Sequence, residues 1–143
     1  MTDAIKKLFA EYEEAFNAHD VEKQVPFFAE HFIFVGLQGS IAQGRDEFAK
    51  MASEAAKFYR SIGQKSAKIL SMDETTISRE YSMVKIHWGV TFEKTGNKLI
   101  EFDVTYIIQK TDPEPKIIMF IAHQDEEKAM KELGLIEKHE MQI

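Results

Sequence analysis

The first part of the chain repeats its apolar residues with the period of a helix. Between about Thr2 and Ala18 an apolar residue returns every three or four positions, which predicts an amphipathic helix. The residues of this stripe are Ile5, Leu8, Phe9, Tyr12, Ala15 and Phe16. His19 belongs to the following turn, and Asp20 is a good N-cap for a short second helix at about Val21–Ala29, shortened or kinked by Pro26.

A strand and a longer helix follow. The segment His31–Leu37 is rich in Phe, Ile and Val and is bounded by glycines, so it predicts a strand. Gly44–Ile62 again carries apolar residues at helical spacing and predicts the third helix, with Gly63 as a residue that ends it.

After Gly63 the apolar period changes from 3.6 to 2. Strands are predicted at about Ser66–Ser78, Glu80–Glu93, Lys98–Lys110 and Lys116–Gln124, and a short closing helix at Glu126–Leu135. Short turns between the strands predict antiparallel neighbours, and strands of this length usually bend. We therefore expect an α+β fold in which a cone-shaped, bent antiparallel sheet wraps around N-terminal helices as one domain over residues 1–143.

The amino-acid composition limits the classes of binding partner and the cellular compartment that we expect. The chain has no cysteine and a net charge of −6, which favours a reducing compartment and argues against a nucleic-acid partner. No apolar run reaches the length of a signal peptide or a membrane span. The sequence thus predicts a cytoplasmic protein that binds neither nucleic acid nor membrane.

Several short motifs occur in an order typical of one superfamily. They are Phe9–Tyr12, Asn17–Asp20, Phe27–Glu30, Gly44–Phe48 and Phe102–Val104. With this layout the chain resembles the nuclear transport factor 2-like superfamily, and most closely its SnoaL-like and ketosteroid-isomerase-like branches. The resemblance implies a cone-shaped fold with a deep pocket and a homodimer formed through the outer face of the sheet. Members include isomerases, cyclases, dehydratases, hydrolases and proteins without activity, so it implies the fold more strongly than the function.

Isomerase-like members use a carboxylate base, a tyrosine and a protonated acid. The resemblance places Tyr12 on the tyrosine and Asp103 on the acid, whereas the base position falls on Gly36 or Val35. Neither residue can take a proton. The chain is therefore not expected to be a ketosteroid isomerase of that mechanism.

Two readings of Asp103 stay open. Periodicity places Phe102, Val104 and Tyr106 inside the cone and Asp103 outside, while the resemblance implies the reverse. His123, followed by Asp125 on the same face, is a further acid/base candidate, and a surface or interface hydrogen bond is the alternative.

Six aromatic residues are candidates for lining an apolar pocket, with ordinary core packing as the alternative. They are Phe16, Phe28, Phe34, Phe58, Trp88 and Phe120. No histidine pair has the spacing of a zinc site on a helix, so neither a metal nor a cofactor is predicted.

One hypothesis is a cofactor-independent isomerase, cyclase or dehydratase of a small apolar carbonyl compound, with Tyr12, Asp103 and His123 as catalytic residues. The other is a non-catalytic domain that binds a small apolar ligand or dimerises.

Overall fold

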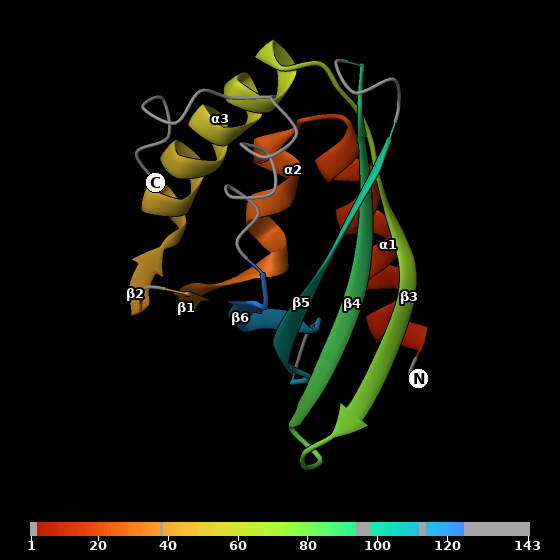
Figure 1. Ribbon diagram of the computed structural model, residues 1–143. Helices are drawn as coiled ribbons and strands as arrows, with labels where there is room; N and C mark the ends of the chain where they lie inside the picture. The colour runs from red at the N-terminus through yellow and green to blue at the C-terminus, as the bar shows by residue number, and fades with distance from the viewer. Residues whose placement is uncertain (1–2, 38, 94–97, 112–113, 125–143) are drawn as a thin grey trace.

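The computed structural model describes residues 3–37, 39–93, 98–111 and 114–124, which form three helices and six strands (Figure 1). The elements are α1 (Asp3–Asn17), α2 (Val21–Gln24), β1 (Phe28–Gly36), β2 (Gly39–Gly44), α3 (Arg45–Ser61), β3 (Gln64–Thr76), β4 (Tyr81–Phe92), β5 (Leu99–Gln109) and β6 (Lys116–Ala122). A single 3-10 turn, Val25–Phe27, joins α2 to β1. It contains Pro26, which ends the second helix earlier than its pattern predicts.

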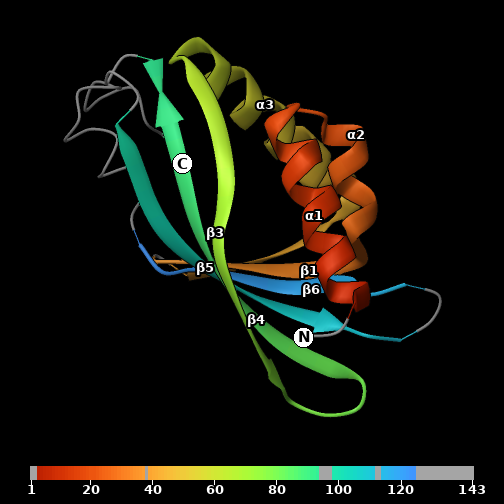
Figure 2. The same ribbon diagram turned by 90° about the vertical axis from the view of Figure 1, so that its right-hand side faces the viewer.

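The six strands form one bent sheet in the order β2-β1-β6-β5-β4-β3. Figure 2 shows the long strands β3, β4 and β5 curving, with α1, α2 and α3 all on the same side of the sheet. This confirms the α+β fold with helices on a curved sheet. The expectation of a wholly antiparallel sheet was wrong in one place, because β1 and β6 pair in parallel. Short turns dictate the direction of consecutive strands only, and β1 and β6 are not consecutive.

The predicted elements are otherwise found near their expected bounds. The first strand begins at Phe28 rather than at His31. The strand β2 was not predicted, because most of its side chains are exposed and leave no alternation of apolar and polar residues. Gly63 follows α3 with φ +79°, the left-handed conformation that glycine adopts without strain. The predicted helix Glu126–Leu135 lies outside the described residues.

The core lies between the helices and the sheet, on what we call the inner face. On β4 and β5 this face consists of Val84, Ile86, Trp88, Val90, Phe92, Ile100, Phe102, Val104, Tyr106 and Ile108. It packs against the apolar stripe of α1, whose Ile5, Leu8, Phe9 and Tyr12 are all buried. The opposite side of the sheet, the outer face, carries no described helix (Figure 2).

Polar side chains fix the helices to the strands. Arg45, the first residue of α3, donates from Nε and Nη2 to the carbonyl oxygen of Phe28, at 3.1 and 2.7 Å. Asn17, at the end of α1, bonds both the N–H and the carbonyl of Ala67 on the edge strand β3. These bonds satisfy backbone groups that an edge strand would otherwise leave open.

Candidate functional sites

Tyr12 is at the centre of an aromatic cluster on the inner face. Its side chain is 8% exposed. Rings of Phe9, Phe16, Phe27, Phe28, Trp88 and Tyr106 all have centroids within 6.4 Å of its own. The indole N–H of Trp88 donates to the hydroxyl oxygen of Tyr106 at 3.2 Å, so the polar atom of the largest core side chain is satisfied.

The six aromatic residues predicted to line a pocket divide into two groups on this face. Phe28 and Trp88 are core residues, 0% and 3% exposed. The other four, Phe16, Phe34, Phe58 and Phe120, are only partly buried. Phe120 joins the groups, because its ring contacts those of Phe28 and of Phe34, with centroids 5.6 and 4.7 Å apart. The inner face therefore combines a packed aromatic floor with rings that keep part of their surface accessible.

Asp103 lies on the outer face, as the period of two predicts and contrary to the family pattern. It is paired with His87 across β4 and β5. The Nδ1 of His87 is 2.8 Å from Oδ1 of Asp103, and its Nε2 is 2.8 Å from Oε1 of Glu101. Tyr12 and Asp103 are thus on opposite faces of the sheet, and the structure does not bring them together.

These bonds shift the pKa values of the groups that make them. The hydrogen bonds to Glu101 and Asp103 raise the pKa of His87, since they stabilise the imidazolium form. The hydrogen bond from His87 lowers the pKa of Asp103, helped by the side-chain bond with Gln124. His87 is therefore a histidine bound by carboxylates at both nitrogens, with neither nitrogen left to act as a base.

His123 lies at the end of β6, also away from Tyr12. Its Nε2 is 2.6 Å from the hydroxyl oxygen of Thr105 on β5. Its backbone N–H donates to the carbonyl oxygen of Asp103 at 3.2 Å. His87 and His123 thus bond different partners on β5, and Asp125, the predicted partner of His123, lies outside the described residues.

The inner face offers no proton acceptor at the positions that correspond to the base and the acid of the isomerase. Gly36 lies on the same face as Phe34, whose ring atoms would be 3.5 Å from an added Cβ. The strand positions on either side of Asp103 that do face inward are Phe102 and Val104. Of the isomerase triad, the inner face keeps the tyrosine.

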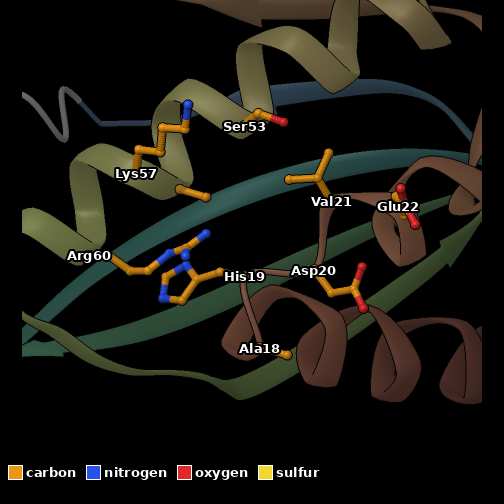
Figure 3. A pocket seen from close by; sticks show the side chains of 9 residues that line it. Ala18, His19, Asp20, Val21, Glu22, Ser53, Lys57 and Arg60 are labelled. Atoms are coloured by element: carbon orange, nitrogen blue, oxygen red, sulfur yellow. The ribbon is translucent and has the colours of Figure 1, made fainter.

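A separate cavity of about 400 Å³ lies between the turn that joins α1 to α2 and the last turns of α3 (Figure 3). Its polar lining comes from His19, Asp20 and Glu22 on one wall and from Ser53, Lys57 and Arg60 on the other. In Figure 3 the guanidinium group of Arg60 lies beside the imidazole of His19. The sequence placed His19 in the turn, as found, but gave no signal that the turn would meet α3.

Within residues 3–37, 39–93, 98–111 and 114–124, no three His, Asp or Glu side chains converge as a metal site would require. None of the helices found there combines the length and the apolar character needed to cross a bilayer.

Comparison with known proteins identifies the fold. The family described as NTF2-like protein (DUF6841) matches residues 2–125. An NTF2-like protein of unknown function from Shewanella oneidensis has a TM-score of 0.70 at 20% identity, over 84% of this chain and 96% of that one. No curated protein matches the chain.

Two similar structures have names that refer to an activity. A putative scytalone dehydratase from Novosphingobium aromaticivorans has a TM-score of 0.64 at 16% identity, covering 82% of this chain and 79% of that one. A ketosteroid isomerase-like protein from Erwinia carotovora has a TM-score of 0.58 at 13% identity, covering 85% and 95%. At such identities the likeness concerns the fold alone.

Proposed function

The chain belongs to the family described as NTF2-like protein (DUF6841), and from this premise we propose that it binds a small apolar ligand on its inner face without isomerase chemistry. The observation that carries the proposal is the group of partly buried aromatic rings beside the packed aromatic floor. A soluble domain rarely leaves several aromatic rings of one cluster incompletely covered unless another apolar surface completes them.

The polar groups of the inner face suit binding rather than proton transfer. Ligand sites are mostly apolar, with a few placed polar atoms that orient the ligand. Here Tyr12 and Tyr106 supply hydroxyls of this kind, and the indole N–H of Trp88, which donates to the hydroxyl oxygen of Tyr106, orients one of them. The base position of the isomerase falls on Gly36 or Val35, and the residues of β5 that face inward beside Asp103 are Phe102 and Val104. None of these side chains exchanges a proton.

Two measurements test this binding. Native mass spectrometry of the purified chain should reveal a co-purifying small molecule. In addition, the uncharged aromatic probe N-phenyl-1-naphthylamine should bind saturably and change the fluorescence of Trp88, which is the single tryptophan of the chain.

Neighbouring residues on β6 provide a matched pair of variants. Phe120 faces inward, whereas Met119 pairs with Ile33 and Ile107 on the outer face. Phe120→Ala should weaken probe binding about tenfold, equivalent to ~1.4 kcal/mol, and Met119→Ala should leave it unchanged. Equal effects of the two variants, or probe binding that does not saturate, would contradict the proposal.

The catalytic roles predicted for Tyr12, Asp103 and His123 stay predictions, as does the homodimer. An Asp103→Asn variant should bind the probe like the unmodified chain, because Asp103 is bonded to His87 on the outer face. Light scattering at micromolar concentration measures whether the chain is a dimer.

A further inference from the structure

We propose that the cavity between the α1–α2 turn and α3 binds the oxyanion group of a small ligand, a phosphate, sulfate or carboxylate, through Arg60, Lys57 and His19. This site is distinct from the aromatic inner face and does not depend on the function proposed for it. Three features of the described residues carry the inference.

The first feature is the wall that α3 supplies. Ser53, Lys57 and Arg60 are spaced by four and three residues, so they lie along one face of the helix and all line the cavity. Among the ion pairs formed within the described part of the chain, none includes Lys57 or Arg60. Two cations and a hydroxyl donor on one helix face are groups that bind oxyanions.

The second feature is the position of His19. The N–H of His19 bonds to Phe16 and that of Asp20 to Ala15, as in the Schellman motif that ends many helices. This motif requires a left-handed residue, usually glycine, yet the chain has a histidine there with φ +54°. Such strained backbone conformations often occur at functional sites.

The imidazole of His19 is next to a cation. His19 lies beside Arg60 (Figure 3), and partial burial together with the charge of Arg60 lowers the pKa of His19. An oxyanion between the two side chains would offset their repulsion, because each could donate a hydrogen bond to it.

The third feature is the separation of charge across the cavity. Asp20 and Glu22 line the wall opposite to Lys57 and Arg60. The carboxylate of Asp20 already accepts from the backbone N–H of Lys23 at 3.2 Å and lies 3.9 Å from its Nζ. This arrangement suits a ligand with one oxyanion group at α3 and hydroxyl or amine donors toward the acids, and it disfavours a polyanion.

Binding should be linked to protonation of His19. An oxyanion beside the imidazole favours its charged form, so binding raises the pKa of His19 and takes up a proton. The pKa of His19 in the unliganded chain lies below 6.5, so affinity should increase as the pH falls toward that lowered pKa. The other charged groups that line the cavity are Lys57, Arg60, Asp20 and Glu22.

Sulfate is a suitable probe, because its charge does not change in this interval. The pKa of His19 is measured by NMR with increasing sulfate, against sodium chloride at the same ionic strength. We expect a saturable rise in the pKa of His19 with sulfate and none with chloride. A parallel titration with acetate shows whether the site prefers phosphate-like or carboxylate groups.

Two variants of α3 separate a site from general screening of charge. Arg60→Gln should weaken sulfate binding at least tenfold. Lys50→Gln removes the same charge from an exposed position of α3 outside the cavity and should have no effect. Equal responses to sulfate and chloride, or equal effects of the two variants, would overturn the proposal. Probe binding to the inner face should be the same in Arg60→Gln, so either proposal can fail alone.

Discussion

The two faces of β4 and β5 differ in character even where their residues are neighbours in the sequence: the inner face is packed and apolar, and the outer face is partly exposed and charged. Trp88 faces inward, is 3% exposed and packs among aromatic rings. His87, one position earlier, faces outward with a side chain that is 33% exposed and bonds two carboxylates. The inner face removes apolar surface from water, which is the main source of stability. The outer face arranges charges that water and salt partly screen, so it contributes less but responds to pH.

The largest effect should come from the inner face. Trp88→Ala removes an indole that contacts Tyr12 and Phe16 and that donates a hydrogen bond to the hydroxyl oxygen of Tyr106. We expect a loss of about 3–5 kcal/mol in the free energy of unfolding, measured by urea denaturation followed by circular dichroism.

The companion variant Trp88→Phe keeps a ring on the inner face but loses the indole N–H. It should cost about 1–3 kcal/mol, because the shape is mostly retained while one buried hydrogen bond is removed. If Trp88→Ala cost no more than a typical surface substitution, the rings of the inner face would not form a packed core.

A smaller, pH-dependent effect should come from His87 on the outer face. Because its pKa is raised in the folded state, its contribution is present below the unfolded value of 6.5 and is lost as the pH rises through the folded value. Stability should therefore fall above pH 6.5, and His87→Gln should flatten this part of the profile. Asp103, with its lowered pKa, loses its contribution only as the pH falls below 3.8.

His19 should have the opposite effect on stability in the adjacent pH interval, below 6.5. Its lowered pKa makes the unfolded state bind more protons, so stability should fall as the pH drops below 6.5. Together the two histidines place the best stability near pH 6.5. Urea denaturation of His19→Gln and His87→Gln across pH 5 to 9 measures the two effects separately. If one of these variants alone removed the pH dependence of stability both below and above pH 6.5, the assignment of each effect to its own histidine would be contradicted.

The smallest effect should come from Gly89, which faces outward between Leu70 and Leu99. A Cβ at this position would lie 2.9 Å from the Cδ1 atoms of both leucines. Their side chains are 44% and 45% exposed and can move aside. Gly89→Ala should therefore change the free energy of unfolding by no more than about 0.5 kcal/mol, and a loss of several kcal/mol would show that the outer face is as closely packed as the inner one.

Periodicity predicted most of the fold, because each long element buries one face. The outward direction of Asp103 followed from the same rule: its neighbours Phe102 and Val104 are apolar, and side chains alternate along a strand. The family pattern gave the opposite direction, since a motif of two residues can match while it is shifted by one position.

Other features depended on contacts between segments that are distant in the sequence. The parallel pair of β1 and β6 joins residues about ninety positions apart, such as Phe28 and Ile117. The cavity required the turn at His19 to meet Arg60 of another helix. Neither the local spacing of residues nor the composition shows which distant segments will be in contact. The exposed strand β2 was missed for another reason, because its residues do not alternate between apolar and polar.

The position of β6 in the sheet also has a consequence for the order of folding. In the strand order, β1 and β2 reach β5, β4 and β3 only through β6, which is the last described strand in the sequence. The antiparallel strands β3, β4 and β5 can pair as soon as they are synthesised, because their contacts are local. The hairpin of β1 and β2 is synthesised first. It cannot join the rest of the sheet until residues 116–122, which form β6, have emerged from the ribosome. A chain that stops before Lys116 would therefore carry two unjoined pieces of sheet, each with an open edge available for association with other chains.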